Sequence, residues 1–369
     1  MSKKEGQKNT WAVIGGGNGG QSAAAHLAVM GYPVRIYDVV PDTINAIKEQ
    51  GGIYVDGAVE GFGPVEKATL NMAEAVEGAN VIMVIAPALY HRDIAEKMAP
   101  SLKAGQIILI HPGATFGAIE FRQVCKEKGA PVESLIVSEA QSLLYACRAK
   151  KAGHAHINGM KQTLAIAALP SSKTKEAVEV ISEAFPQMYG AKNVLETSLT
   201  NLNAVMHPAP SLLNVSLIES KHDWEYYMEG ITPSIGSYAE RLDLERLALG
   251  KAVKLELPGV LQMYRTLYGV TKPTLSETVK EVKAYKGITG QKRIDTRYVL
   301  EDIPMGLVPM ASLGDQLGVP VPMIRTTIAL GSYLLEKDFV GQGRTMERLG
   351  LAGLDAEGLL GFVTNGDRD

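Results

Sequence analysis

The stretch Trp11–Gly20, which reads WAVIGGGNGG, decides the fold of this chain. Four apolar residues lead into a cluster of glycines, and a run of small residues at helical spacing follows. Gly15, Gly17 and Gly20 fit the pattern G-x-G-x-x-G. In that pattern the first glycine permits a sharp exit from a strand, the second lets a pyrophosphate approach the backbone, and the third lets the helix pack closely. The stretch therefore predicts a strand, a tight loop and a helix whose N-terminus attracts phosphate.

A second predicted strand, Pro33–Asp38, ends in an acidic residue. Asp38 follows Gly20 by 18 residues (38 − 20), close to the spacing of the carboxylate that binds the adenosine ribose 2′-hydroxyl of a dinucleotide. A carboxylate there repels a 2′-phosphate, so the sequence favours NAD(H) over NADP(H). The alternative is a Gly-rich turn followed by an aspartate that only caps local structure. The predicted cofactor contacts are Gly15, Gly17, Asn18, Gly19, Gly20 and Asp38.

Composition bounds the class of protein. At 369 residues, 46% apolar and 21% charged, the chain is long enough for two domains with substantial cores. Its net charge of −3 gives no electrostatic footprint for nucleic acid or an anionic membrane. No uninterrupted apolar run approaches the ~18 residues that span a bilayer. Only two cysteines are present, with no metal-binding spacing, so we expect a cytoplasmic protein without a bound metal.

The first ~150 residues alternate strand and helix patterns, as doubly wound sheets do. A Gly-rich segment at residues 53–63 predicts a hairpin within this part of the chain. Val81–Ile85 is a continuous apolar run, typical of a strand buried on both faces of a parallel sheet, and Gln106–Ile110 is a further predicted strand. We therefore predict an α/β, doubly wound Rossmann domain. Ligands bind beyond the carboxyl ends of such strands, so the breaks at Pro87 and at Pro112–Thr115 are further candidate cofactor contacts. Simple termination of the strands is the alternative for both breaks.

The pattern changes in the second half of the chain. Strand-like segments at 155–158 and 163–170 are expected to close the first domain. From about residue 197, long helix-patterned segments dominate, among them 199–205 and 211–219, which predicts an all-α catalytic domain. We place the NAD-binding Rossmann domain at residues 1–193 and the helical domain at residues 194–369. The active site is then expected in the cleft between the two domains.

His207 is the candidate for proton transfer. A helix-patterned segment, Leu199–Val205, leads to His207, and the following Pro208 disfavours helix at that histidine. A histidine at a helix end just after a domain junction is well placed to face the cleft. Imidazole gains and loses a proton readily near neutral pH, and hydride transfer to a C=O or C=N group needs such a donor.

The segment Ile294–Pro304 concentrates charge. It contains Arg297, Tyr298, Glu301 and Asp302. On a regular helix Arg297 and Glu301 would pair at i,i+4 as a surface salt bridge. Arg297 and Asp302 are five residues apart, so such a helix would put them on different faces. Spacing alone therefore does not bring both residues to one site.

The chain resembles the octopine/nopaline (opine) dehydrogenase family and, within it, the bacterial N-(1-carboxyethyl)-norvaline dehydrogenase type. The resemblance runs along nearly the whole length. It is carried by the glycine loop 15–20, Pro112–Thr115, Asn203–Pro208, Tyr226–Ser234, Thr296–Tyr298 with Glu301 and Asp302, and Gly343–Glu347. The segments around His207 and Arg297 are much more specific than the glycine loop. One departure is His111, where relatives carry a different polar residue.

The resemblance implies reductive condensation. An α-keto acid such as pyruvate and the amino group of an L-amino acid or amine form an imine, which NADH reduces to an N-(1-carboxyalkyl) amino acid. His207 would give and take the proton at the reacting carbon. Asp302 would hold and polarise His207, favouring its protonated form, and Arg297 would bind a substrate carboxylate. A homodimer and a neutral or apolar amino acid substrate are further expectations, with Met206, Tyr226 and Tyr227 as pocket candidates or ordinary packing.

Two other functions remain open. A 2-hydroxy acid or glycerol-phosphate-type dehydrogenase would have a similar fold plan and would need a catalytic lysine. Lys192, Lys251 and Lys254 are the lysines nearest plausible cleft positions, and none lies in a convincing motif. A non-enzymatic dinucleotide sensor would need a DNA-binding or docking element, and the sequence has no basic recognition segment.

Overall fold

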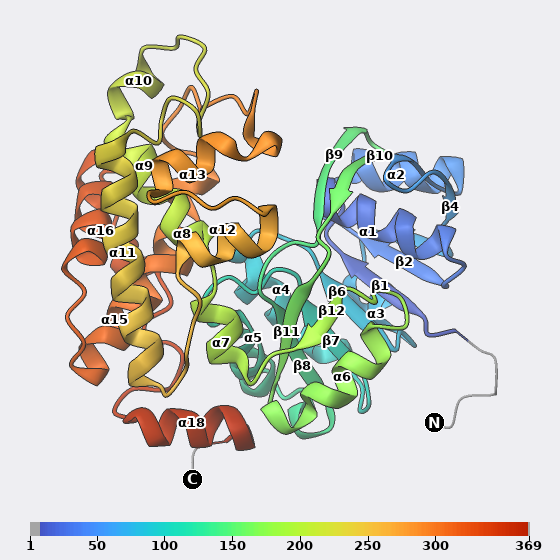
Figure 1. Cartoon of the computed structure of the whole chain (residues 1–369). Helices are drawn as coiled ribbons and strands as arrows, with labels where there is room; N and C mark the ends of the chain where they lie inside the picture. Colours follow the sequence, from blue (N-terminus) through green and yellow to red (C-terminus); the bar gives the residue numbers. More distant parts are fainter. Residues whose placement is uncertain (1–7, 368–369) are drawn as a thin grey trace.

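The computed structural model describes residues 8–367, which form two lobes joined at one side (Figure 1). The N-terminal lobe is built on an eight-stranded sheet in the order β12-β11-β8-β7-β6-β1-β2-β5. Neighbours from β8 to β5 pair in parallel, whereas β11 runs antiparallel to β8. The doubly wound Rossmann sheet is therefore confirmed. Its strands are β1 (Trp11–Ile14), β2 (Val34–Tyr37), β5 (Lys67–Thr69), β6 (Val81–Val84), β7 (Ile107–Ile110), β8 (Ile136–Ala140), β11 (Leu164–Leu169) and β12 (Met188–Gly190).

Side chains of the central strands alternate between two hydrophobic cores, as the two-residue period of a strand requires. Trp11 and Val13 of β1 pack with α1 (Asn18–Val29), α2 (Pro41–Gln50) and α6 (Thr174–Ile181). Ala12 and Ile14 face the other core, which contains residues of the remaining helices of this lobe. Those helices are α3 (Met72–Val76), α4 (His91–Met98) and α5 (Gly117–Glu127).

A second, four-stranded sheet covers the outer side of α1. Its order is β4 (Gly61–Pro64), β3 (Gly52–Gly57), β10 (His154–Met160) and β9 (Tyr145–Lys151). All four strands contact α1. The hairpin expected around residues 53–63 is confirmed as β3 and β4. The strand-like segment 155–158 belongs to the first domain as expected, as part of β10, which pairs with β3 and β9 in this second sheet.

After β12, the described residues of the C-terminal lobe form helices joined by loops, with one isolated bridge between Glu225 and Thr289. Figure 1 shows the long α11 packed beside α15 and α16 in this lobe. Its α-helices are α7 (Val194–Leu199), α8 (Asn203–Met206), α9 (Pro208–Leu213), α10 (Val215–Glu219), α11 (Pro233–Ala252), α12 (Val260–Tyr268), α13 (Leu275–Glu281), α14 (Arg297–Leu300), α15 (Val308–Leu317), α16 (Pro322–Leu335), α17 (Phe339–Gln342) and α18 (Ala356–Asn365).

Asparagine side chains interrupt two of the expected helices. The helix predicted over 199–205 is divided into α7 and α8, and Asn201 between them accepts a hydrogen bond from the Asn203 N–H at 3.2 Å. The helix predicted over 211–219 is divided at Asn214, whose amide donates to the carbonyls of Pro210 and Gly230. Asparagine favours such local bonds over a continuous helix.

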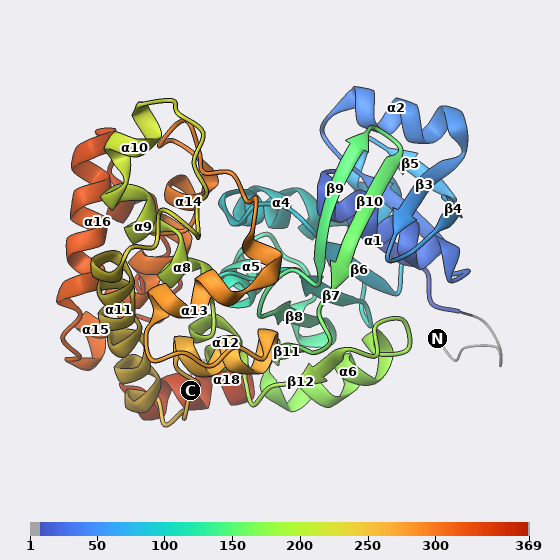
Figure 2. The same ribbon diagram turned by 45° about the horizontal axis from the view of Figure 1, so that its top comes forward.

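The two lobes share one hydrophobic core. The core that covers one face of the first sheet continues into the helical lobe through α5 and α7, which contact each other. Figure 2 shows this junction from a second direction, with the β9–β10 hairpin standing apart from the helical lobe. Among residues 8–367, no helix is long and apolar enough to cross a lipid bilayer.

Candidate active site

The glycine loop after β1 has the geometry of a phosphate cradle. Gly15 has φ +112°, and a Cβ there would lie 2.1 Å from the Ile85 carbonyl oxygen. A Cβ at Gly20 would lie 1.7 Å from the Gly15 carbonyl oxygen, so α1 approaches the loop too closely for any side chain. Gly17 is exposed and has no atom within 4 Å of the Cβ position, so a ligand can approach the backbone there. Because α1 begins at Asn18, its free N–H groups point toward that open space.

Asp38 lies beside this loop at the carboxyl end of β2. Its Oδ2 accepts a hydrogen bond from the Gly16 N–H, and its Oδ1 accepts one from the Val40 N–H at 2.8 Å. Pro87 is exposed just beyond β6, the strand next to β1, where the strand order changes direction. This is where ligands bind to doubly wound sheets. These residues therefore fit a dinucleotide.

Two of the predicted cofactor contacts, Asn18 and the Pro112–Thr115 loop, make hydrogen bonds to other parts of the protein. The Asn18 Oδ1 accepts a hydrogen bond from the Ala149 N–H at 2.8 Å, so this side chain ties α1 to β9. The Pro112–Thr115 loop is bound by Arg344 of the helical lobe, whose Nη1 donates to the carbonyls of Gly113 at 3.1 Å and Thr115 at 3.0 Å. Thr115 is fully buried. An interlobe connection thus holds the Pro112–Thr115 loop in place, and its contact with the cofactor stays a prediction.

His207 and Asp302 form a buried pair in the helical lobe. Nδ1 of His207 lies 2.8 Å from Oδ2 of Asp302, and each side chain is only 7% exposed. His207 stands between α8 and α9, where Pro208 begins a new helix, as its position before proline predicts. Because Asp302 engages Nδ1, the other ring nitrogen, Nε2, is the one left for a ligand.

Two tyrosines hold the His207 ring and backbone. The Tyr298 ring stacks on the imidazole, with centroids 3.8 Å apart and planes 2° from parallel. The Tyr226 hydroxyl lies 3.0 Å from the carbonyl oxygens of both Met206 and His207. Burial raises the pKa of Tyr226 well above its ordinary value, so this group is a neutral phenol. Tyr226 therefore fixes the backbone at Met206 and His207 by hydrogen bonding.

A π-helical turn explains how residues five apart reach one site. α14 ends at Leu300 and the π-helix Ile303–Leu307 follows. The Asp302 N–H donates to the Arg297 carbonyl at 3.3 Å, an i→i−5 bond. In a π-turn, residues five apart lie nearly above one another, and such turns are frequent at functional sites. Arg297 and Asp302 thus lie on adjacent levels of one turn.

Arg297 is exposed at the start of α14, with its guanidinium 5.7 Å from the Tyr298 ring centroid. The same Tyr298 ring stacks on His207, so Arg297 and His207 adjoin one tyrosine. Arg297 does not line the cavity described below. The alternative of a surface salt bridge between Arg297 and Glu301 is wrong. The π-turn directs Glu301 inward, where its Oε1 accepts a hydrogen bond from the Ala88 N–H at 2.9 Å. Burial raises the pKa of Glu301, and neighbouring Asp302 raises it further.

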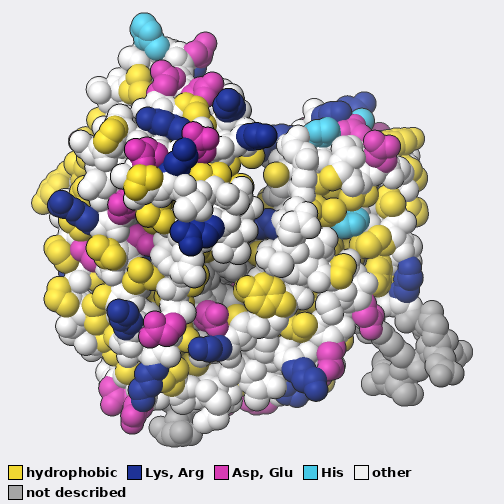
Figure 3. Space-filling model, in the orientation of Figure 1, with side chains coloured by type: hydrophobic (Ala, Val, Ile, Leu, Met, Phe, Trp, Pro, Cys, Tyr) yellow, Lys and Arg dark blue, Asp and Glu magenta, His cyan; other side chains and the backbone are white. Residues whose placement is uncertain are grey.

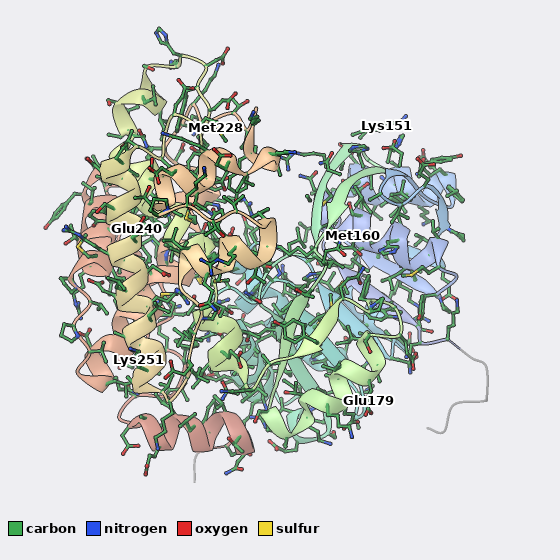
Figure 4. The ribbon with its side chains drawn as sticks, in the orientation of Figure 1. Lys151, Met160, Glu179, Met228, Glu240 and Lys251 are labelled. Atoms are coloured by element: carbon green, nitrogen blue, oxygen red, sulfur yellow. The ribbon has the colours of Figure 1, made fainter. Side chains whose placement is uncertain are left out.

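A cavity of about 120 Å³ lies between the lobes and has His207 in its wall. Its apolar and aromatic wall comes mainly from the helical lobe and includes Met206, Tyr227, Met263, Tyr264, Leu267, Tyr268 and Tyr285. Figure 3 shows a notch between the lobes with Lys and Arg side chains at its rim. In Figure 4, Met228 and Lys151 mark opposite sides of that notch, and Met160 lies on the inner side of the Rossmann lobe. Of the pocket candidates, Met206 and Tyr227 line the cavity, whereas Tyr226 packs behind it.

The lysine that lines this cavity is Lys161, in the connection between β10 and β11. The three lysines named from the sequence are wrong for this role. Lys192, Lys251 and Lys254 are exposed and outside the cavity wall, and Figure 4 shows Lys251 at the far end of α11. Sequence reasoning passed over Lys161 because it follows an irregular strand with no recognisable motif.

His111, the apparent departure from the family pattern, is fully buried. Its Nε2 accepts a hydrogen bond from the Leu144 N–H at 2.8 Å. Burial, with a smaller effect of Lys161, lowers the pKa of His111 to about 3. His111 is therefore a neutral scaffold residue beneath the cavity. Within the described residues, no cluster of three His, Cys, Asp or Glu residues is arranged for a metal ion.

The fold and this site define an NAD-dependent oxidoreductase with a helical second domain. Residues 190–335 match the family described as NAD/NADP octopine/nopaline dehydrogenase, alpha-helical domain. Residues 10–114 match the family described as NAD-dependent glycerol-3-phosphate dehydrogenase N-terminus. That second match covers only the cofactor-binding half.

Comparison with whole proteins identifies the family. The chain is 42% identical to an opine dehydrogenase of Arthrobacter sp. (strain 1C), over 97% of this chain and 99% of that one. It therefore belongs to the opine dehydrogenase family. It is also 25% identical to the ocs protein of Agrobacterium vitis, over 95% and 97% of the two chains. A structure of octopine dehydrogenase in complex with NADH and agmatine shares the fold, with a TM-score of 0.82, 20% identity and coverage of 98% and 99%.

Proposed function

We propose that this protein catalyses the NADH-dependent reductive condensation of an α-keto acid, such as pyruvate, with the amino group of an L-amino acid or amine. The product is an N-(1-carboxyalkyl) amino acid or amine. The observation that carries the proposal is the buried His207–Asp302 pair in the wall of an interlobe cavity. The similarity to the Arthrobacter opine dehydrogenase supports it, as do solved structures of octopine dehydrogenase with NADH and L-arginine and with NADH and pyruvate.

The proposed roles follow from the positions of the side chains. The amine attacks the keto carbon, water leaves, and the resulting C=N bond is reduced. Nε2 of His207 exchanges a proton with the oxygen or nitrogen bonded to the reacting carbon, while Asp302 fixes the ring orientation through Nδ1. Bound NADH supplies the hydride. Arg297, outside the tyrosine cavity and beside Tyr298, binds the keto acid carboxylate through its planar guanidinium.

The test is NADH oxidation with pyruvate, with and without a panel of L-amino acids. NADH oxidation is expected only when both the keto acid and the amine are present. NADH oxidation that never depends on the amine would contradict the proposed function. His207→Ala should remove turnover and keep NADH binding. His222→Ala is the matched control because His222 is exposed in the same lobe, remote from the cavity wall. Near-normal turnover of His207→Ala would remove His207 from the mechanism.

The substrate amine is proposed to be a neutral or apolar L-amino acid. The cavity wall contains no Asp or Glu among its described residues, so nothing there pairs with a cationic side chain. Its tyrosines and methionines favour an apolar one. In the amino acid panel, neutral residues should therefore give lower KM values than arginine or lysine.

NAD(H) is proposed as the preferred cofactor over NADP(H). Asp38 beside the loop supports this preference because its carboxylate repels a 2′-phosphate. The fold alone does not decide it, since a yersinopine dehydrogenase with a TM-score of 0.74 carries NADP+. Asp38→Ala should weaken NADH binding and relax discrimination against NADPH. An unchanged ratio of kcat/KM for the two cofactors would contradict the role of Asp38.

A homodimer is proposed from apolar side chains on the outer helices. Leu244 on α11, Tyr333 on α16 and Val340 on α17 are 64%, 81% and 53% exposed. Contacts join α11 to α16 and α16 to α17, so these three helices adjoin one another. Light scattering should give twice the chain mass of 39.6 kDa. Tyr333→Glu should shift it toward the single-chain value, and a wild-type protein of single-chain mass would contradict the dimer.

The domain boundary and the cellular location stay predictions. We propose that residues 1–193 and 194–369 are the functional units, supported by the short segment between β12 and α7. A cytoplasmic location is supported by two buried, unpaired cysteines, Cys125 and Cys147. Fractionation of the native host would test the location.

A further inference from the structure

Lys161 is a half-buried cation to which the proposed reaction assigns no role. It lies in the wall of the same cavity as His207 but comes from the Rossmann lobe. Its ammonium group donates to the Ser142 Oγ at 2.8 Å and to the Leu143 carbonyl at 2.7 Å. An ammonium group has three N–H donors, so one remains for a ligand. These two bonds fix the position of the charge.

No protein carboxylate balances this charge. Within residues 8–367, no Asp or Glu forms an ion pair with Lys161, and none lines the cavity. Burial lowers the pKa of Lys161 to about 8, so the group is still mostly protonated at neutral pH. Withdrawing part of a cation from water without a counter-charge is costly, and an anionic ligand would offset that cost. The cavity is therefore prepared for an anion.

The proposed product carries two carboxylates when the amine is an amino acid, one from each substrate. The two cations near His207 lie in different places. Arg297 lies outside the cavity beside Tyr298, whereas Lys161 lies inside the cavity that contains the tyrosines. An amino acid has its side chain and its carboxylate on the same carbon. A side chain held among Tyr227, Tyr264 and Tyr285 therefore carries its own carboxylate into the compartment of Lys161.

We propose that Lys161 binds the α-carboxylate of the amino acid substrate and thereby selects amino acids over amines that lack a carboxyl group. This inference rests on the proposed function. Arg297 then serves the keto acid, so the two carboxylates are held at separate cations on either side of the reacting carbon. Lys161 acts in substrate specificity and takes no part in proton transfer.

The test compares two amines that differ only by the carboxyl group, L-norvaline and butylamine, each with saturating pyruvate and NADH. Lys161→Met keeps the length of the side chain and removes the charge. The KM for norvaline should rise about 10- to 100-fold, the loss expected for a charge-assisted hydrogen bond, while the KM values for butylamine and pyruvate stay within about twofold. Lys161→Arg should recover part of the norvaline affinity. Lys173→Met, at an exposed lysine of the same lobe, is the control.

Each result has a separate meaning. A norvaline KM in Lys161→Met that matches the Lys173→Met control overturns the role of Lys161 while the proposed function stands. A rise in the pyruvate KM instead of the norvaline KM assigns Lys161 to the keto acid and also overturns the inference. Retained turnover of butylamine shows that the variant is folded, and loss of both amines together contradicts a role in specificity. If the wild-type protein oxidises NADH with pyruvate and never needs an amine, the proposed function fails first.

Discussion

Asp302→Asn probes the buried pair most sharply. The substitution keeps the shape of the side chain but removes the charge 2.8 Å from His207 Nδ1. Both side chains are only 7% exposed, so solvent screens their interaction little. A hydrogen bond to a charged group contributes about 1.5–3 kcal/mol. If that interaction is made fully in the transition state, its loss lowers kcat by roughly 10- to 150-fold.

The assay is steady-state NADH oxidation at saturating keto acid and amine, with NADH binding followed by fluorescence. Asp295→Asn is the matched control because Asp295 lies in the same segment, pairs with Arg293 and is 40% exposed. We expect kcat to fall in Asp302→Asn alone, with NADH affinity unchanged in both variants. A kcat within twofold of the control would refute the reasoning that Asp302 orients and polarises His207.

Three further predictions concern the scaffold. Gly17→Ala should raise the Kd for NADH without lowering Tm, because the added Cβ meets no protein atom. Gly20→Ala should lower Tm, because its Cβ would lie 1.7 Å from a carbonyl oxygen. Equal Tm values for the two variants would contradict this reasoning. Arg344→Met leaves Glu120 buried without its partner at 2.7 Å, so urea denaturation should show a loss of about 3–5 kcal/mol, and a loss under 1 kcal/mol would contradict it. Burial lowers the pKa of His111 to about 3 from 6.5, so the unfolded chain takes up the proton first as pH falls. The free energy of unfolding should be highest above pH 6.5 and fall below it by about 1.4 kcal/mol per pH unit from this residue, and His111→Gln should flatten that slope; an unchanged slope would count against it.

The sequence was sufficient for the first lobe wherever a residue type has one physical use. Gly15 needs its positive φ, and the strands at 81–85 and 106–110 are buried on both faces. These local features are enough to predict the Rossmann sheet. The β9 strand was not anticipated because Tyr145–Lys151 lacks a clear alternation of apolar and polar residues, and the sequence did not show that its partner β10 belongs to a second sheet. Strand pairing is a long-range property that local pattern does not contain.

The site shows the same division. His207 was found from its place before Pro208, which is local information. The proximity of Arg297 and Asp302 could not be predicted from their spacing, because a regular helix puts residues five apart on different faces and the chain forms a π-turn there. Lys161 was missed because its meaning depends on a cavity built from residues about a hundred positions away, such as Tyr264.

The most direct test of the central claim follows the hydride and the nitrogen in one reaction. The protein is incubated with pyruvate, ¹⁵N-labelled L-norvaline and NADH that carries deuterium in the transferred position, and the products are identified by mass spectrometry. Reductive condensation should give a secondary amine that retains the ¹⁵N and carries one deuterium on the former keto carbon. Deuterated lactate beside unchanged norvaline would contradict it.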